Sequence, residues 1–590
     1  MKTDFSKYAN LVIVSLLAIV FFVATSSFNY FTQDQNYVKW SSPDETANYF
    51  FSKKFSETGQ LAFFDQAAVI GDNMVMPRSL RSDFGWLKPV SFLGIVLTYG
   101  TIGAWLGAAV IPFLTPFFAA LGIIIFYLLV ERLFNKRIGL LSAFLLASFP
   151  VYVYYTVRSM FHNVLFIVLL LIGVYLLSLA LGDRKEKLKQ KFISFSLKLP
   201  VWLGWIFAFF SGVFTSLAII TRTSELLWLL PAFFLVWLFY ARRLGISKLI
   251  LFLAGLIIAC LPVLYWNKVL YNAFLHGGYN EMNRSLDEIS QASGELVKST
   301  WRGQVEQYGF HFKKLARNIF YFGFNAHQSI SMFKHYVLEM FPVLLYSGLL
   351  GLVILGVQTI RRWQKKYLVY VLVWLTLGTI LVFYYGSWLF NDNPDPNRFT
   401  IGNSYTRYWL PIYLMLMPLA ALAIIRVSQA ILLINQKTKA KVRRLIANGL
   451  QAAIILVIMA SAIIFVLYGS EEGLAYLYYN NKLEKVSVEQ VVFLTEPEAV
   501  IITRYYDKFF WPERRVIMGT IPDQELLTAV SKLAQYYPVY YYNFYLNEAD
   551  VNYLNERKLP DYNLEMKIIK KINSTFGLYQ LNHHLYEENK

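Results

Sequence analysis

Two neighbouring carboxylates, Asp44 and Glu45, lie in the segment SSPDETANYFFSKKFSETG, which follows shortly after an apolar stretch over residues 11–31. A carboxylate held at a membrane surface, outside the bilayer, has the chemistry to accept a proton from an incoming hydroxyl group. Asp44 has such a position in the chain. We therefore predict that Asp44 is a general base and that Glu45 belongs to the same catalytic site.

The same segment also has the pattern of a helix start. Ser42 is a candidate N-cap, Pro43 suits the first helical position, and Glu45 would complete a capping box with Ser42. Gly59 is the expected end of the helix. In this alternative, Asp44 and Glu45 are capping acids without a catalytic role.

The predicted helix has its apolar residues on one side, which is typical of a helix that lies along a membrane surface. These residues are Ala47, Phe50, Phe51 and Phe55. The helix dipole would favour the ionised form of Asp44, making it a correctly charged but weak base. Orientation and a nearby cation would then have to supply much of the catalytic effect.

Composition shows what surrounds these carboxylates. Of 590 residues, 56% are hydrophobic and only 16% are charged, which is too apolar for a water-covered globule and indicates a bilayer. The formal net charge of +18 is spread between apolar runs instead of gathering on one face or arm, so nucleic acid is not expected as a partner. Cys260, the single cysteine, excludes both an intrachain disulfide and a cysteine metal site.

Apolar stretches without charges are long enough to give roughly eleven membrane crossings as helices. The first stretch is longer than the core of a signal peptide and lacks a small-x-small cleavage site, so we expect a retained anchor. The stretches lie at 11–31, 89–130, 138–157, 163–182, 199–221, 226–241, 249–267, 340–360, 367–391, 408–425 and 445–470. The predicted fold class is a polytopic α-helical membrane protein with a C-terminal extracytoplasmic α/β domain.

The distribution of Lys and Arg predicts the sidedness of these crossings. If the N-terminus is cytoplasmic, every inner loop carries at least three Lys or Arg, as the positive-inside rule requires. An odd number of crossings then places the C-terminal segment outside. Residues 89–130 are long enough to cross twice, but two crossings would turn every later basic loop outward. We therefore expect one crossing there, preceded by an interfacial or re-entrant piece.

Besides short outer pieces at 158–162 and 222–225, the outer segments expected from this topology are 32–88, 268–338, 392–407 and 471–590, and chemistry should lie there. In the last of them, AVIITRYY, RRVIMGT and PVYYYNFYL predict strands, while DQELLTAVSKLAQYY and EADVNYLNERKL have helical periodicity. The predicted domains are a membrane module over 1–470, with the first three outer segments as its loops, and a small α/β domain over 471–590.

An acidic motif in the first outer loop, on a chain with many spans and an outer C-terminal domain, resembles the GT-C glycosyltransferases. These include the protein O-mannosyltransferases and the transferase that adds aminoarabinose to lipid A. The resemblance covers most of the membrane part and rests on the order of several segments. These are KPVSFLGIV with Lys88, RLFNKRIGLLSAFLLASFPVYVYY, TRYWLPIYLML with Arg407 and Tyr408, and VIITRYYDKFFWPERRVI.

Two positions depart from the family pattern. Leu87 stands where the aminoarabinose transferase has an acid before its Lys-Pro, so a metal site like the one there is not expected. After the third span, where many relatives have an acidic residue, this chain has His162 and Asn163. A divalent metal stays an open possibility, with His162 as its weak candidate ligand. The alternative is a histidine at a membrane interface.

The resemblance implies a donor sugar on a polyprenyl phosphate, whose leaving phosphate needs positive charge. Arginine is a suitable clamp for such a group. The predicted phosphate-binding residues are Lys88, Arg158, Arg222, Arg407 and Tyr408. Arg78 and Arg81 are further outer-face candidates. Each cation also has a simpler interpretation as a charge at a span end, and Arg222 has a second one as an ion pair with Glu225 that tethers a turn.

The leading hypothesis is an inverting glycosyltransferase of the multi-pass plasma membrane, in which Asp44 accepts the acceptor's proton while Arg407 and Lys88 hold the carrier phosphate. Its partners would be a polyprenyl-phosphate sugar and an acceptor that is a lipid, a glycan or a protein. The alternatives are a flippase for lipid-linked sugars and a non-catalytic assembly protein. A flippase is expected to carry ionisable residues near the bilayer midplane, whereas the polar residues here accumulate in outer loops.

Overall fold

The computed structural model describes residues 5–32, 40–182, 191–192, 195–196, 202–277, 323–361, 363–390, 392, 395, 398–434, 440–469 and 472–583. The chain folds as two compact units, each built from three separate stretches. The first unit comprises Met1–Phe28, Phe113–Pro262 and Gly294–Tyr476. The second comprises Asn29–Pro112, Val263–Ser293 and Leu477–Lys590. Most of the expected outer segment 268–338 lies outside the described residues.

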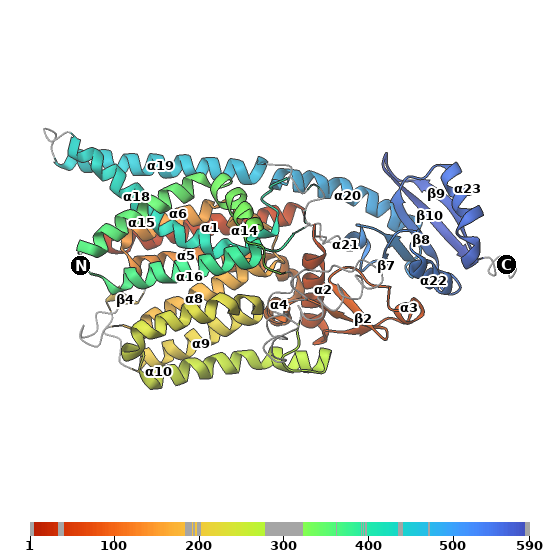
Figure 1. The fold of residues 1–590 in the computed structure, drawn as a ribbon, viewed down its shortest axis with the longest axis horizontal. Coiled ribbons are helices and arrows are strands. Elements are labelled where there is room, and N and C mark those ends of the chain that lie inside the picture. The colour runs from red at the N-terminus through yellow and green to blue at the C-terminus, as the bar shows by residue number, and fades with distance from the viewer. Residues whose placement is uncertain are drawn as a thin grey trace. The chain divides into compact units, whose positions relative to one another are not determined.

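Helices, most of them long and apolar, form the first unit, and most of them are labelled in Figure 1. They are α1 (Phe5–Thr32), α5 (Ile111–Leu133), α6 (Lys136–Ser148), α7 (Pro150–Val157), α8 (His162–Ala180), α9 (Leu203–Thr221), α10 (Leu226–Tyr271), α14 (Ala326–Phe333), α15 (Pro342–Arg361), α16 (Lys365–Gly386), α17 (Ser404–Tyr408), α18 (Leu410–Ile434) and α19 (Ala440–Tyr468). Short elements join them: a two-residue hairpin of β4 (Lys191–Phe192) and β5 (Phe195–Ser196), a 3-10 turn at Thr223–Glu225 and a π-helix at Lys334–Glu339.

The number of membrane-length helices is close to the roughly eleven crossings that the sequence predicts. Within the described ranges, nine helices are long and apolar enough to cross a bilayer, and α6 with α7 forms a further pair that passes together but is bent by 51°. The longest of the nine includes α10, which is broken by a non-helical Gly245 with φ 64° and therefore holds two spans. Counting the bent pair and both halves of α10 gives eleven segments, and the protein is an integral membrane protein.

Residues 89–130 contain one membrane-length helix, as expected. Gly107, with φ 94°, ends the shorter apolar helix α4 (Leu93–Leu106), and a 3-10 turn at Ala108–Val110 leads into α5. Only the part that includes α5 reaches the length of a span. The expected short piece before the crossing is therefore a helix.

Glycines allow neighbouring helices of the first unit to approach closely. A Cβ added at Gly212 of α9 would clash with the carbonyl oxygen of Phe252 in α10, and one at Gly255 of α10 would clash with that of Phe209. Likewise, a Cβ at Gly351 of α15 would clash with the carbonyl oxygen of Leu419 in α18. Small residues at such crossings are the usual means of packing helices in lipid.

The segment expected to be the first outer loop folds in the second unit as helices around a small sheet. Its elements are α2 (Pro43–Thr58), β1 (Phe63–Phe64), α3 (Gln66–Ile70), β2 (Leu80–Asp83), β3 (Trp86–Pro89) and α4, with antiparallel strands in the order β1-β3-β2. As predicted, α2 starts after Ser42 and ends at Gly59, which has φ 67°.

The apolar side of α2 is buried in protein, a role that the sequence did not indicate. Phe51 is fully buried and Ala47 nearly so, and α2 packs on α4. The ring of Phe50 packs 4.2 Å from that of Trp511 and 5.5 Å from that of Phe63. Tight packing within the loop and against the C-terminal segment therefore accounts for the aromatic residues.

The C-terminal segment is an α/β domain, as predicted (blue in Figure 1). Its elements are α20 (Leu474–Leu494), β6 (Val500–Thr503), α21 (Asp507–Phe510), β7 (Arg515–Met518), α22 (Gln524–Leu533), β8 (Val539–Phe544), α23 (Glu548–Arg557), β9 (Leu564–Lys571) and β10 (Phe576–His583). The sheet order is β7-β6-β8-β10-β9, with β6 parallel to both of its neighbours and β10 antiparallel to both of its own. The predicted strands and helices are β6, β7, β8, α22 and α23, whereas α20, β9 and β10 were not anticipated.

Candidate functional site

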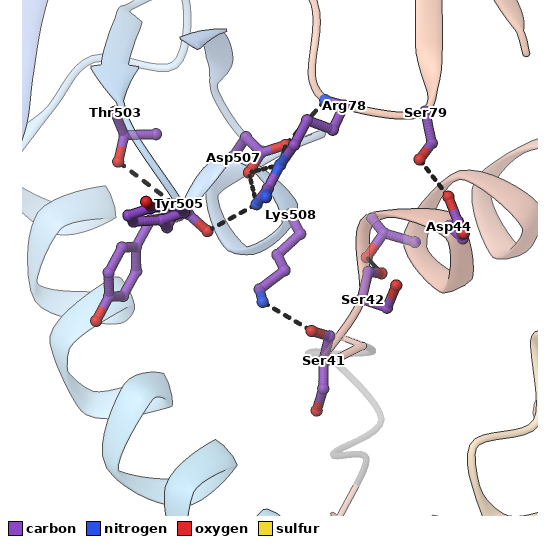
Figure 2. Close-up of polar contacts among 11 residues, drawn as sticks. Ser41, Ser42, Asp44, Arg78, Ser79, Thr503, Tyr505, Asp507 and Lys508 are labelled. Atoms are coloured by element: carbon purple, nitrogen blue, oxygen red, sulfur yellow. Dashed lines mark hydrogen bonds and ion pairs between the residues drawn. The ribbon is translucent and has the colours of Figure 1, made fainter. Parts of the chain in front are cut away.

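Asp44 lies in the first turn of α2, but no capping box forms there. Ser42 occupies the N-cap position with extended backbone angles, yet its side chain makes no cap hydrogen bond. The carboxylate of Asp44 instead accepts a hydrogen bond of 2.5 Å from the hydroxyl group of Ser79, as Figure 2 shows. The reciprocal capping expected from Ser42 and Glu45 is therefore wrong.

The two acids of the predicted catalytic pair have different environments. Glu45 is 1% exposed, whereas Asp44 is only partly buried. A group that exchanges a proton with an arriving hydroxyl group must be reachable, so Asp44 is the better candidate of the two. Glu45 lies inside the packed face of α2 together with Asn48, which is also 1% exposed.

Ser79 reaches Asp44 because its backbone has an unusual conformation. Its φ of 65° lies in the left-handed region, which a serine seldom adopts without support from its surroundings. The support comes from the preceding residue, Arg78. The backbone N–H of Arg78 donates to Asp507 Oδ2 at 2.8 Å, and its guanidinium forms an ion pair of 2.6 Å with Asp507 Oδ1.

Lys88 is held in a β-hairpin in the second unit. Phe84 and Gly85, with φ of 51° and 81°, form the two-residue turn between β2 and β3, and the register places Lys88 opposite Arg81. Lys88 Nζ lies 2.6 Å from Asp83 Oδ2, while Arg81 Nε lies 3.1 Å from Asp83 Oδ1. Asp83 is therefore a carboxylate between two cations.

The remaining contacts of Lys88 also lie within the second unit. Its ammonium donates to the carbonyl oxygen of Leu270 at 3.2 Å and lies 5.1 Å from the ring centroid of Tyr271. Burial alone would raise the pKa of Asp83, but the hydrogen bonds and charges of Lys88 and Arg81 outweigh burial and hold that pKa below its usual value. Leu87, the residue before the Lys-Pro, is buried.

The other predicted phosphate-binding residues come together in the first unit, at the ends of three helices and next to the start of a fourth, α8. Arg158 follows α7, Arg222 follows α9, and Arg407 and Tyr408 lie in α17. The guanidinium groups of Arg158 and Arg407 lie 4.8 and 4.2 Å from the ring centroid of Phe161. Those of Arg407 and Arg222 lie 5.1 and 4.5 Å from that of Tyr408. We call Arg158, Arg222 and Arg407, together with Phe161 and Tyr408, the arginine cluster.

Arg222 forms the ion pair with Glu225 that was its alternative interpretation. Its Nε lies 2.9 Å from Glu225 Oε1, and the two side chains are 4% and 2% exposed. The hydroxyl group of Tyr385 donates to Glu225 Oε1 at 2.8 Å and accepts from Arg222 Nη2 at 3.1 Å. The ring of Tyr385 stacks on that of Tyr408 at 4.5 Å. The ion pair thus fixes the turn and also orients the guanidinium toward Tyr408.

His162 and Asn163 begin α8 next to the arginine cluster. Asn163 Nδ2 donates to the backbone oxygen of Arg407 at 3.1 Å, so this departure from the family pattern positions α17. His162 is buried, and within the part of the chain that the structure describes no group of three His, Cys, Asp or Glu residues is placed to hold a metal ion. His162 is therefore not part of a recognisable metal site among those residues.

Several residues of these sites were not expected from the sequence. Ser79 and Asp507 are ordinary polar residues whose partners lie far away in the chain, and no local pattern identifies them. Phe161 and Tyr385 belong to aromatic runs at span ends, where interfacial placement is the usual explanation. Asp83 had a usable signal, since it lies five residues before Lys88 across a possible two-residue turn.

Comparison with known proteins agrees with this architecture. Residues 106–266 match the sequence family described as dolichyl-phosphate-mannose-protein mannosyltransferase. The fold is similar to that of ArnT from Cupriavidus metallidurans in the apo state, with a TM-score of 0.53, 12% identity, and coverage of 96% of this chain and 98% of that one. No curated protein matches the chain.

A second solved structure is similar over most of the chain. The oligosaccharyltransferase of Archaeoglobus fulgidus, in complex with Zn and sulfate, aligns with a TM-score of 0.50 and 12% identity, covering 96% of this chain and 72% of that one. The resemblance to the GT-C glycosyltransferases is therefore confirmed, by the family match over residues 106–266 and by the fold.

Proposed function

We propose that the protein is a membrane glycosyltransferase that moves a sugar from a polyprenyl-phosphate carrier to an acceptor hydroxyl group at the extracytoplasmic face. The observation that carries this proposal is the arginine cluster, in which three guanidinium groups converge on two aromatic rings at helix ends. The name of the matching family, which specifies dolichyl-phosphate-mannose, supports a donor of this class.

The leaving group of such a donor is a phosphate ester, and it needs positive charge more than it needs a proton. Guanidinium groups bind phosphate oxygens with two parallel hydrogen bonds, and their charge stabilises the phosphate as the glycosidic bond breaks. Phe161 and Tyr408 hold the three arginines in place by cation–π contacts. We assign phosphate binding to Arg158 and Arg407, with Tyr408 as their support. Arg222, whose charge is already paired with Glu225, contributes by its contact with Tyr408.

Lys88 has a smaller role in this proposal than the sequence suggested. A phosphate at Lys88 would have to compete with Asp83, which lies 2.6 Å from the ammonium and is itself held by Arg81. Replacing a partly buried ion pair by another anion gains little, because the pair already satisfies both charges. We infer that Lys88 stabilises the hairpin whose first strand, β2, begins directly after Ser79.

The acceptor half of the reaction requires a base, and we propose Asp44. The acceptor oxygen forms a bond to the anomeric carbon while the bond from that carbon to the phosphate oxygen breaks. The hydroxyl proton goes to the Asp44 carboxylate, and the carrier leaves as polyprenyl phosphate. A single displacement of this kind inverts the configuration at the anomeric carbon. The hydrogen bond from Ser79 orients the carboxylate and leaves its second oxygen for the proton.

The proposed topology follows from the same distribution of charge. Eleven membrane-length segments and basic inner loops favour a plasma-membrane protein with a cytoplasmic N-terminus and an extracytoplasmic C-terminal domain. Asp44 lies outside the membrane-length helices, and the arginine cluster lies at helix ends. Glycosylation labels or cysteine tags at residue 44 and in the C-terminal domain should both report the extracytoplasmic side.

The direct test uses membranes from cells that lack the gene, supplied with purified protein and radiolabelled polyprenyl-phosphate mannose or aminoarabinose. We expect transfer of label into an acceptor from one of these donors, and loss of that transfer in Asp44→Asn with normal membrane insertion. Addition of EDTA tests for a metal requirement. Mass spectrometry of surface glycans with and without the gene identifies the product.

The same variant separates the proposal from the alternatives. A flippase would move a fluorescent polyprenyl-phosphate sugar across liposome membranes equally well in the wild type and in Asp44→Asn, and an assembly protein would transfer nothing. Full transfer activity in Asp44→Asn would exclude the proposed mechanism.

A further inference from the structure

The C-terminal domain contacts the first outer loop at two residues that influence the position of Asp44. One is Ser41, which directly precedes the N-cap of α2. The other is Arg78, which directly precedes Ser79. Two consecutive residues at the start of α21, Asp507 and Lys508, hold these two residues, as Figure 2 shows.

The contact between Asp507 and Arg78 is the stronger of the two. Asp507 is fully buried and accepts from the backbone N–H of Arg78 at 2.8 Å, from its Nε at 3.2 Å and from its Nη2 at 2.6 Å. The guanidinium also donates to the carbonyl oxygen of Tyr505 at 3.1 Å. An ion pair with several hydrogen bonds fixes both the position and the orientation of the Arg78 side chain and backbone, so the chain just before Ser79 has little conformational freedom.

The second contact fixes the start of α2. Lys508 Nζ donates to the carbonyl oxygen of Ser41 at 2.7 Å, and the hydroxyl group of Ser41 donates to Asn481 of α20 at 3.1 Å. Ser41 is three residues before Asp44, so its fixed backbone sets the direction in which the first turn of α2 leaves. Both partners of the hydrogen bond between Ser79 and Asp44 are therefore held from the C-terminal domain.

We propose that Asp507 and Lys508 are positioning residues for Asp44, which makes the C-terminal domain part of the catalytic apparatus and not a separate binding module. This inference rests on the proposed function of Asp44 as the base. Asp507 acts through Arg78, whose backbone leads into the left-handed φ of Ser79, and Lys508 acts through Ser41. A misplacement of a catalytic group by about 1 Å costs on the order of 100-fold in rate.

The test compares two Asp→Asn variants that each break one ion pair between the outer loop and the C-terminal domain. Asp507→Asn cuts the chain of contacts that leads to Asp44. Asp65→Asn is the matched control, since Asp65 pairs with Arg515 at 2.9 Å and involves none of the residues in that chain. Asparagine at position 65 still accepts the N-cap hydrogen bond from Ala67, so α3 is preserved.

Steady-state kinetics with radiolabelled polyprenyl-phosphate mannose or aminoarabinose, whichever donor the wild type uses, gives the first readout. We expect Asp507→Asn to lower kcat by roughly 100-fold with a donor KM within about threefold of wild type, because orientation of the base and not donor binding is lost. Lys508→Met should lower kcat by about tenfold, since it removes one of two anchors. Asp65→Asn should stay within about threefold in both constants.

A double variant shows whether Asp507 acts through Asp44. If it does, Asp44→Asn with Asp507→Asn has the residual rate of Asp44→Asn alone, because a lost base cannot be misplaced further. Multiplying losses would overturn the inference. Hydrogen exchange on the purified, detergent-solubilised protein gives a readout independent of activity. Asp507→Asn should speed exchange of the amides at residues 41–48 and 78–80, and Asp65→Asn should not.

The outcomes separate this inference from the proposed function. An Asp44→Asn variant with full transfer activity refutes the function itself. If Asp44→Asn is inactive while Asp507→Asn matches Asp65→Asn in kcat and in hydrogen exchange, the function stands and the positioning role is wrong.

Discussion

Replacing Arg407 by glutamine tests whether the arginine cluster holds the carrier phosphate. Arg407 is 9% exposed, and its guanidinium lies 4.2 Å from the ring of Phe161 and 5.1 Å from that of Tyr408. A bound phosphate in contact with it would lie at about 4 Å, where two unit charges attract by about 4 kcal/mol at an effective dielectric of 20. Losing that attraction lowers kcat/KM for the donor by about 10³-fold.

Arg407→Lys separates the effect of charge from that of geometry, because lysine keeps the positive charge but cannot form two parallel hydrogen bonds to a phosphate or stack on the two rings. We expect Arg407→Lys to lower kcat/KM by about 10- to 30-fold, between wild type and Arg407→Gln. The assay is the initial rate of label transfer at increasing concentrations of the polyprenyl-phosphate sugar. Binding of undecaprenyl phosphate alone, measured by its protection against thermal unfolding, should weaken in the same order.

Arg132→Gln is the matched control for loss of an arginine. Arg132 makes two hydrogen bonds, of 3.1 and 2.8 Å, to the carbonyl oxygen of Ser178 in another helix, but it lies outside the arginine cluster. Its loss should lower thermal stability and leave kcat/KM within about threefold. The reasoning is refuted if Arg407→Gln stays within that range, or if Arg132→Gln and Arg407→Gln lose activity equally.

Three further predictions concern stability. Glu225→Gln leaves Arg222 buried without its carboxylate, so we expect the free energy of unfolding to fall by about 3–5 kcal/mol. Tyr385→Phe should lower it by less, and equal losses in urea titrations of the detergent-solubilised protein would contradict this order. The ion pairs of Asp83 lower its pKa in the folded protein, so they stabilise the fold above the pKa of the unfolded chain, and this stabilisation is lost as the pH falls through the folded pKa. Acidification below about pH 4 should therefore lower the melting temperature of the wild type more than that of Asp83→Asn. An equal fall in both melting temperatures would count against the ion pairs. In α15, Gly351→Ala should reduce thermal stability, because its Cβ would clash with the backbone of Leu419. A Cβ at Gly356 has no atom within 4 Å, so Gly356→Ala should be neutral or stabilising. An unchanged melting temperature in Gly351→Ala would refute the close helix crossing.

The sequence was sufficient to predict the features that depend on local pattern. Apolar length revealed the membrane-length helices, including the single one within 89–130, and strand and helix patterns located β6, β7, β8, α22 and α23. The pattern was present but overlooked in β9, where buried Leu564 and Met566 alternate with more exposed Glu565 and Lys567. The alternation is short, because the second half of the strand is mostly exposed.

Features that depend on distant partners were beyond prediction. The capping box of Ser42 and Glu45 was expected from four adjacent residues, but the Ser42 side chain makes no cap hydrogen bond. The hydrogen bond from Ser79 to Asp44, from a residue 35 positions further along the chain, left no local pattern. The burial of the apolar side of α2 was not predicted, because the rings that pack on Phe50 come from Phe63 and from Trp511, far along the chain. The cations at span ends were identified by position, whereas their gathering around Phe161 and Tyr408 depends on how four helix ends pack.

The ion pair between Arg78 and Asp507 also determines when during biosynthesis the outer loop completes its fold. The two residues are 429 positions apart, so at 5–20 residues per second the ribosome needs about 20 to 90 s to make the second after the first. During that interval Asp44 is already made while its supporting contacts are not. A chain that terminates prematurely before Asp507 would leave Asp65, Asp72 and Arg78 without their ion-pair partners, and we expect it to be degraded faster than the full chain.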